Sequence, residues 1–239
     1  MIPGQMEIHI VHYAPGAARA RGLAVIIDVF RAFSAACYAF DRGAQSIIAT
    51  QSLETARALK RNHPRYLLMG ERHAVKPPDF EFGNSPSELV QADLFGKTLV
   101  HTTHAGTRAL LAASHAESVI TGSFVNAGAI AAHIRKRSPE SVYLVCAGFE
   151  GDKEAAEDLL CAKYLQQLLR GEDPDFNPIP EQLRTAPSAL RFFDPKDPAS
   201  PEIDFHMCLD LDRFGFVIKR SHADARMCTL VRQSALFSD

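Results

Sequence analysis

The sequence lacks the features that mark membrane-spanning and nucleic-acid-binding proteins. Its 239 residues contain no tryptophan, and 26 basic residues against 28 acidic ones leave a formal net charge of −2. Without an overall basic excess we expect no nucleic-acid partner. No apolar run comes near the ~20 residues that a bilayer span needs. The first 15 residues also lack the charged start and apolar stretch of a signal peptide. We therefore expect no membrane partner.

Cysteine is too scarce and too scattered for a disulfide framework or a structural zinc site. No two of the five cysteines stand in a Cys-x-x-Cys pair, and each lies among apolar residues. Such cysteines are best explained as small buried side chains in a reducing compartment. The sequence therefore predicts a cytoplasmic protein.

Several catalytic signatures are also absent. There is no GxGxxG dinucleotide motif, no Walker A motif, no HExxH metal motif and no GxSxG nucleophile elbow. The Asp-x-Asp-x-Thr pattern of haloacid-dehalogenase-type phosphatases is missing as well. Its second Asp and its Thr are replaced by Phe30 and Ala32. These absences argue against an aspartyl-phosphate mechanism of that type.

Short apolar runs alternate with helical patterns through the first 170 residues. Strands are expected at residues 23–27, 46–49, 66–69, 99–102, 118–120 and 142–146. Helices are expected between and after them, at residues 31–42, 53–60, 86–92, 107–113, 126–137 and 154–170. Because the strands do not strictly alternate polar and apolar residues, both faces of their sheet should be covered. The pattern predicts a three-layer α/β/α fold with a mostly parallel or mixed sheet.

The pattern changes after residue 170. Seven of the 14 prolines fall within residues 174–201, which excludes a long helix or a central strand there. We expect residues 1–170 to form the main α/β domain and residues 171–202 a proline-rich linker or surface excursion. Residues 203–239 should form a smaller C-terminal α/β element that packs on the main domain, with strands at 203–212 and 214–219.

Two charged residues follow the first expected strand. In open α/β sheets, ligands bind outside the carboxyl ends of the strands. Asp28 ends this strand and Arg31 opens the next helix. A carboxylate there suits a metal ion, and a guanidinium suits a phosphate or a sulfonate. The alternative is an N-cap aspartate paired with a helix arginine.

Later strand ends carry turns rich in hydroxyl, amide and glycine groups. Ser85 and Glu88 flank Pro86 in the pattern of a capping box, and such a helix start still offers N–H groups to an anion. The recurrence of such turns predicts an oxyanion-binding cleft, whereas caps that serve stability alone are the alternative. The candidate ligand-binding residues are Asn84, Ser85, Thr103, Gly106, Thr107, Ser123 and Asn126.

Acidic residues gather at the start of the last long helix. Residues 150–158 hold five acids and one lysine, and Glu154, Glu157 and Asp158 share one helical face. Acids at a helix start also complement its dipole, which is the plainer explanation. The sharper hypothesis is a magnesium site built from this cluster and Asp28.

Taken in order, these segments resemble the 2-phosphosulfolactate phosphatase family. The resemblance covers roughly residues 24–164 and is most specific in Asp-Val-Phe-Arg-Ala after the first strand and Gly-Asn-Ser-Pro at 83–86. It implies a three-layered α/β fold and a magnesium-dependent hydrolase that removes phosphate from 2-phospho-3-sulfolactate, on the route to coenzyme M. The shared motifs fall on Asp28, Arg31, Glu71, Asn84, Ser85, Thr103, Gly106, Thr107, Ser123, Asn126, Glu157 and Asp158.

The chain departs from the family pattern at turns near the expected site. Thr-Thr-Asn-Gly-Thr becomes Thr-Thr-His-Ala-Gly-Thr, with His104 and Ala105 making the turn one residue longer. His73 and Ala74 replace a frequent Gly-Gly, and Glu81 replaces an Asp. These changes bear on the identity of the substrate more than on the class of reaction.

The resulting hypothesis is phosphomonoester hydrolysis by a metal-activated water, with no covalent intermediate. Asp28 with Glu157 or Asp158 would hold Mg²⁺, and Arg31 with the N–H-rich turns would neutralise a small anionic phospho-acid. Glu71 would position or deprotonate the water. Three alternatives are a phosphatase for another 2-phospho-acid, a non-catalytic protein that binds a small dianion, and a structural scaffold. A homo-oligomer is compatible with the sequence.

Overall fold

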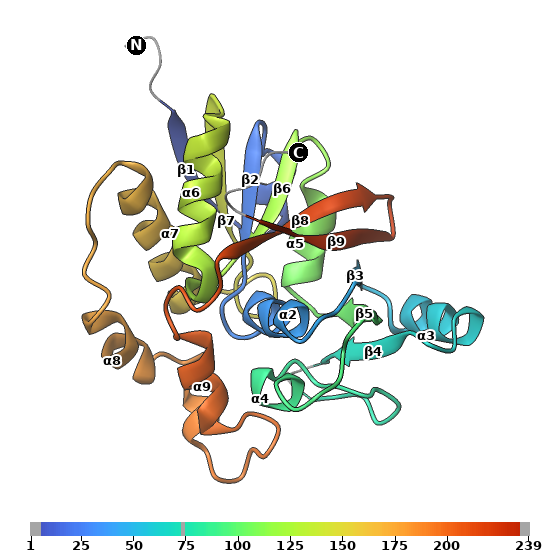
Figure 1. Cartoon of the computed structure of the whole chain (residues 1–239). Helices are drawn as coiled ribbons and strands as arrows, with labels where there is room; N and C mark the ends of the chain where they lie inside the picture. Colours follow the sequence, from blue (N-terminus) through green and yellow to red (C-terminus); the bar gives the residue numbers. More distant parts are fainter. Residues whose placement is uncertain (1–5, 73–74, 235–239) are drawn as a thin grey trace.

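Two parallel groups of strands, joined by an antiparallel hairpin, make up the sheet. The computed structural model describes residues 6–72 and 75–234, and within them nine strands run in the order β1-β7-β2-β6-β8-β9-β3-β5-β4 (Figure 1). The first group is parallel and contains β1 (Glu7–His12), β7 (Ser141–Cys146), β2 (Leu23–Ile27) and β6 (Ser118–Gly122). The second is also parallel and contains β3 (Ser46–Thr50), β5 (Thr98–Thr102) and β4 (Leu67–Gly70).

The hairpin of β8 (Phe216–Ala223) and β9 (Met227–Ser234) lies between these two groups. β8 runs antiparallel to β6, and β9 runs antiparallel to β3. The sheet is therefore mixed, and residues from the C-terminal end of the chain lie in its middle. The expected strand at 214–219 is confirmed within β8, whereas β9 was not expected.

Apolar clusters cover both faces of β2. Ala24 and Ile26 belong to one cluster, with α1 (Tyr13–Ala18), α2 (Ala32–Asp41) and α5 (Gly106–Ala112). Leu23, Val25 and Ile27 belong to the other, with α6 (Ala127–Arg137), α7 (Ala156–Leu169), α8 (Pro178–Arg184) and α9 (Glu202–Cys208). The three-layer α/β/α fold with a mixed sheet is thereby confirmed. α3 (Leu53–Asn62) and α4 (Pro86–Leu89) complete the set of described α-helices.

The six strands expected in the first 170 residues are confirmed within two residues at either end, as β2 to β7. β1 and α1 were not expected. β1 is an edge strand paired with β7, and most of its residues are half-buried. It therefore lacks the continuous buried run that identifies the inner strands.

The expected strand at residues 203–212 is wrong, because this segment contains helix α9. Phe205, Cys208 and Leu209 recur at helical spacing and are buried in the cluster on one face of the sheet. A short apolar run bounded by polar residues does not by itself separate a strand from a helix.

The proline-rich segment, residues 171–202, packs into the apolar cluster that also contains α7 and α9. It contains α8 and a short 3-10 helix, η2 (Leu190–Phe193), and it buries Ile179, Leu183 and Phe192. Pro178 stands at the start of α8, where a backbone N–H would have no partner within the helix. Proline at this position is therefore compatible with a helix.

The carboxyl ends of both parallel groups converge on one pocket. Residues after β2 and β7 line it together with residues after β4 and β5. His73 and Ala74, which depart from the family pattern, lie outside the described residues. Within the described ranges, no helix is both long and apolar enough to cross a membrane.

Candidate active site

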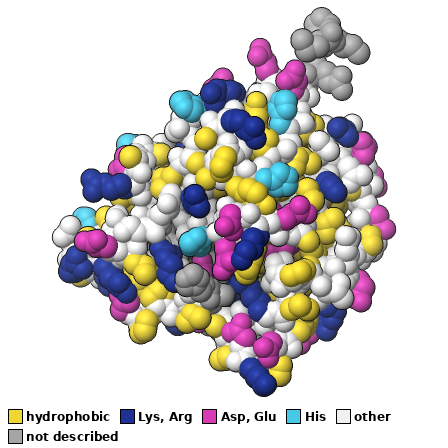
Figure 2. Space-filling model, turned by 180° about the vertical axis from the view of Figure 1, so that it is seen from behind, with side chains coloured by type: hydrophobic (Ala, Val, Ile, Leu, Met, Phe, Trp, Pro, Cys, Tyr) yellow, Lys and Arg dark blue, Asp and Glu magenta, His cyan; other side chains and the backbone are white. Residues whose placement is uncertain are grey.

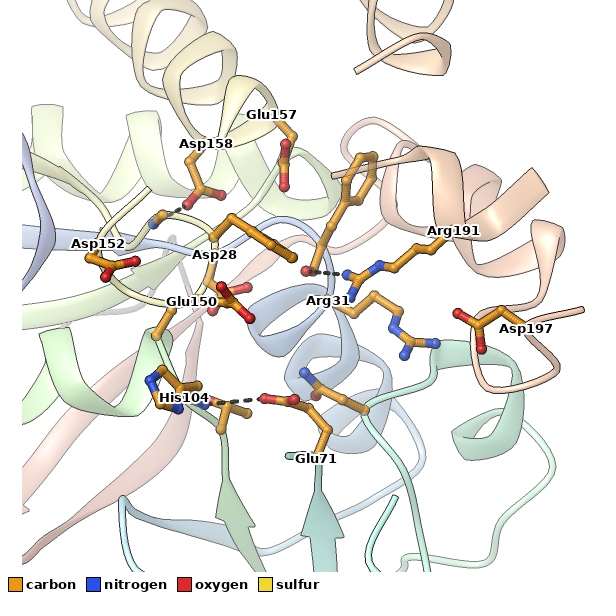
Figure 3. A pocket seen from close by; sticks show the side chains of 16 residues that line it. Asp28, Arg31, Glu71, His104, Glu150, Asp152, Glu157, Asp158, Arg191 and Asp197 are labelled. Carbon is orange, nitrogen blue, oxygen red and sulfur yellow. Dashed lines mark hydrogen bonds between the residues drawn. The ribbon is translucent and has the colours of Figure 1, made fainter. Parts of the chain in front are cut away.

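A cavity of about 420 Å³ gathers most of the predicted site residues (Figure 3). This volume lies within the usual range of small-molecule sites, roughly 300–1,000 Å³. Asp28, Arg31, Glu71, Glu157 and Asp158 all line it. Figure 2 shows the face turned away in Figure 1, where acidic, basic and histidine side chains lie intermixed.

Three buried carboxyl groups form the acidic wall of the cavity. Asp28 Oδ1 accepts the backbone N–H of Ala32 at 3.1 Å, and Glu157 Oε2 accepts the hydroxyl of Ser188 at 2.6 Å. Asp158 accepts the backbone N–H of Val29 with Oδ1 and that of Gly148 with Oδ2, both at 2.9 Å. Asp158 thus ties the chain after β2 to the chain after β7.

Burial makes ionisation of these three acids unfavourable. Desolvation raises the pKa of Asp28 to about 7. The hydrogen bond from the Ala32 N–H lowers this pKa, whereas the charges of Glu71 and Glu157 raise it. Desolvation also raises the pKa of Glu157 and that of Asp158, and the charges of Asp28 and Glu157 raise the pKa of Asp158 further. A site of this kind favours either a shared proton or a bound cation.

The acidic wall fits a magnesium ion shared with substrate better than an all-protein metal cage. Across residues 6–72 and 75–234, no three His, Cys, Asp or Glu side chains are grouped closely enough for such a cage. Asp158 uses both oxygens on backbone N–H groups, whereas Asp28 and Glu157 each keep one oxygen outside the hydrogen bonds just described. Mg²⁺ often takes one or two carboxylates and completes its shell with water and phosphate oxygens.

Two guanidinium groups form the basic wall. Arg31 Nη1 donates to Asp204 Oδ2 at 2.7 Å and to the carbonyl of Ala199 at 2.9 Å, and this ion pair is almost fully buried. Arg191 donates from Nη2 to the carbonyl of Phe30 at 2.9 Å. Desolvation and the charge of Arg31 both lower the pKa of Arg191. Figure 3 shows both arginines on the side of the pocket opposite Asp152 and Glu150.

Arg191 was not among the predicted site residues. It lies in η2, inside the segment predicted to be a proline-rich linker or surface excursion. The available signal was its position between large apolar residues, in Leu-Arg-Phe-Phe, which is atypical of a solvated linker. Glu150 and Asp152, which belong to the predicted acidic cluster, also line the cavity, as does Asp197, which was not predicted.

The third wall carries Glu71 and Asn84. Glu71 follows β4, and its Oε1 accepts the backbone N–H of His104 at 3.2 Å. Asn84 Oδ1 lies 3.0 Å from Nε2 of the buried His101. Burial and the charge of Arg72 lower the pKa of His101 to about 3, so its ring is neutral and donates from Nε2. His101 thereby fixes the amide plane of Asn84. Thr103 completes this wall.

Five predicted ligand-binding residues do not line the cavity: Ser85, Gly106, Thr107, Ser123 and Asn126. Ser85 caps α4 by accepting the Glu88 N–H at 3.4 Å and lines a neighbouring cleft. The Thr107 hydroxyl donates to the carbonyl of Thr103 at 2.6 Å. The Ser123 hydroxyl lies 2.6 Å from that of Ser34, and Asn126 Nδ2 donates to the Phe216 carbonyl at 3.2 Å. Asn126 also makes no side-chain cap to α6.

Gly106 lies so close to Asp28 that no side chain fits between them. A Cβ atom at this position would stand 2.7 Å from Asp28 Oδ2 and 3.1 Å from Phe33 Cζ. Gly106→Ala is therefore expected to displace the Asp28 carboxylate. The kcat of a reaction catalysed in this cavity should fall by about 10-fold to 100-fold. Gly215→Ala is the matched control, because nothing lies within 4 Å of its Cβ position. Equal kcat values for the two variants would contradict this role of Gly106.

Together, the fold and the cavity define an α/β protein with a pocket at the carboxyl ends of its parallel strands, in which buried acids face two arginines. The chain belongs to the 2-phosphosulpholactate phosphatase family, whose family model matches residues 8–192.

Curated relatives carry the same family name. The chain is 42% identical over 156 residues to a "Probable 2-phosphosulfolactate phosphatase" of Caldicellulosiruptor saccharolyticus, covering 64% of each chain. It is 30% identical over 198 residues to the protein of that name from Bacillus subtilis, covering 82% of this chain and 85% of the relative. For the protein of that name from Thermotoga petrophila the identity is 34% over 183 residues, covering 77% and 74%.

Proposed function

We propose that the chain is a magnesium-dependent phosphatase that converts 2-phospho-3-sulfolactate and water to 3-sulfolactate and phosphate. The observation that carries this proposal is the single cavity in which Asp28 and Glu157 face Arg31 and Arg191. Membership of the family and the names of the relatives support the same reaction. Within the proposal, the reaction stands on the route to coenzyme M. The five free, buried cysteines support a reducing cytoplasmic location.

Asp28 and Glu157 are the residues that would hold the magnesium ion. When bound, the ion polarises a phosphate oxygen and makes a coordinated water more acidic. Arg31 and Arg191 neutralise the negative charge of the substrate, and the low exposure of Arg31 strengthens its interaction with it. Glu71 is held at the wall by the His104 N–H and is our candidate for orienting the attacking water. Positioning and electrostatics suffice for phosphoryl transfer, so no covalent intermediate is required.

A panel of phospho-acids tests this proposal. The full chain is mixed with 2-phosphosulfolactate, 2-phospholactate or phosphoglycolate, each with Mg²⁺ and with EDTA, and phosphate release is measured. We expect magnesium-dependent release that is fastest from the sulfonated substrate. Tight binding of these acids without any turnover would instead identify a non-catalytic protein for small dianions. Acid quenching during turnover should trap no phosphorylated protein.

Glu157→Gln should lower kcat in this assay by about 100-fold or more, because it removes a buried carboxylate charge beside Asp28. The amide still offers Ser188 an oxygen, so the fold should persist. Glu172→Gln is the matched control, since Glu172 is exposed just after α7. A Glu157→Gln enzyme as fast as the control would remove Glu157 from the proposed machinery.

A further inference from the structure

Arg191 is a half-buried arginine that forms no ion pair with a carboxylate among the described residues. Arg31, by contrast, is paired with Asp204 at 2.7 Å. Among the described residues, the hydrogen bond of Arg191 goes to the backbone carbonyl of Phe30, and its Nε is buried without a partner. A buried N–H group left without a hydrogen-bond acceptor is costly unless a ligand supplies one.

The surroundings of Arg191 suit a weakly hydrated anion. Its guanidinium lies 5.1 Å from the centre of the Phe192 ring, and Phe192 packs edge-on against Phe30 at 5.1 Å. Phe30 and Arg191 both line the cavity. A sulfonate spreads its charge over three oxygens and stays ionised beside other acids. The planar guanidinium fork can engage two such oxygens at once.

The position of the acidic wall indicates how the substrate is oriented in the cavity. The reacting phosphate belongs beside Asp28 and Glu157, where the metal would be held. Arg191 lines the same cavity as Asp28 and Glu157. A small substrate that carries a phosphate and a second acid group can therefore contact both walls of the 420 Å³ cavity.

We propose that Arg191 binds the sulfonate, one of the two acid groups of this substrate that do not react, and thereby selects sulfonated phospho-acids over those without a sulfonate. This inference rests on the proposed function, because that function supplies the sulfonated substrate. It assigns the choice of substrate to a residue of the proline-rich segment.

Binding of 3-sulfolactate tests the role of Arg191 without requiring turnover. Calorimetric titration at fixed Mg²⁺ compares the wild-type chain with Arg191→Met, Arg191→Lys and Arg184→Met. We expect Arg191→Met to raise the Kd by about 30-fold or more and Arg191→Lys to raise it less. Arg184→Met should match the wild type, because Arg184 is half-exposed, stacks on Phe193 and does not line the cavity. Thermal melting of each variant without ligand checks its fold.

Hydrolysis rates give a second reading. The ratio of kcat/KM for 2-phosphosulfolactate to that for 2-phospholactate should fall in Arg191→Met by a factor similar to the rise in Kd. The inference is overturned if Arg191→Met binds 3-sulfolactate as the wild type does, if the wild type does not bind it, or if the ratio of kcat/KM values is unchanged in Arg191→Met. Arg191-dependent binding by a wild-type chain that hydrolyses no phospho-acid would refute the proposed function and leave the sulfonate site standing.

Discussion

Asp28→Asn is expected to lower kcat for phosphate release by about 10³-fold or more, with the fold intact. Asp28 follows β2 and lines the cavity, where the charges of Glu71 and Glu157 both act on it. Asparagine keeps an oxygen for the Ala32 N–H but removes the negative charge. Asp41→Asn, at the exposed end of α2, is the control and should retain full activity.

The same substitution is expected to stabilise the metal-free protein at high pH. Burial raises the pKa of Asp28 from 3.8 to about 7, so the folded chain holds this proton more tightly than the unfolded chain does. The stabilisation from that proton is fully present below about pH 4 and is lost as the pH rises through about 7. Asparagine does not titrate. The free energy of unfolding of Asp28→Asn, relative to the wild type, should therefore increase between pH 4 and pH 8.

Urea unfolding in EDTA at several pH values measures this difference. An increase on the order of a few kcal/mol is expected. Wild-type kcat in Asp28→Asn would show that Asp28 is not central to the reaction. A relative stability that does not change with pH would show that burial does not raise the pKa of Asp28.

Asp204→Ala is expected to cost about 3–5 kcal/mol of folding free energy. Asp204 is fully buried in α9, where its Oδ2 accepts Arg31 Nη1 at 2.7 Å and its Oδ1 accepts the Ser87 N–H at 2.9 Å. Its removal leaves the Arg31 guanidinium buried without a counter-charge. Because Arg31 lines the cavity, phosphatase activity should fall as well.

Urea unfolding of Asp204→Ala and, separately, of Asp210→Ala compares the loss of a buried ion pair with the loss of an exposed one. Asp210 pairs with Arg213 at 2.8 Å on the surface, so its loss should cost at most about 1 kcal/mol. Replacing Arg31 by Met together with Asp204 by Leu should recover part of the stability, because no lone charge remains. If Asp204→Ala and Asp210→Ala lose the same free energy of unfolding, the Arg31–Asp204 pair does not stabilise the fold more than an exposed pair does.

The inner strands and the acidic wall were predictable because their signals are local. β2 is a continuous buried run, and Asp28 and Arg31 follow it directly in the sequence. The position of a residue after a strand does not, however, fix the direction of its side chain. Ser123 follows β6 as Asp28 follows β2, yet the Ser123 hydroxyl turns to Ser34 and away from the cavity.

The features that escaped prediction depend on contacts between distant parts of the chain. The β8–β9 hairpin lies in the middle of the sheet because it pairs with β6 and β3, far away in sequence. Arg191 reaches the cavity because α8 and η2 fold back onto the cluster around Phe30 and Phe205. Neither arrangement leaves a periodic pattern in the sequence.

Magnesium-dependent release of phosphate from 2-phosphosulfolactate is the most direct test of the proposed site. The full chain is stripped of metal with EDTA, and the rate is followed as Mg²⁺ is restored. The site predicts a rate near zero without metal, saturable recovery with Mg²⁺ in the wild type, and no recovery in Asp28→Asn. Hydrolysis that persists without metal and is unaffected by Asp28→Asn, or no hydrolysis at any Mg²⁺ concentration, would contradict it.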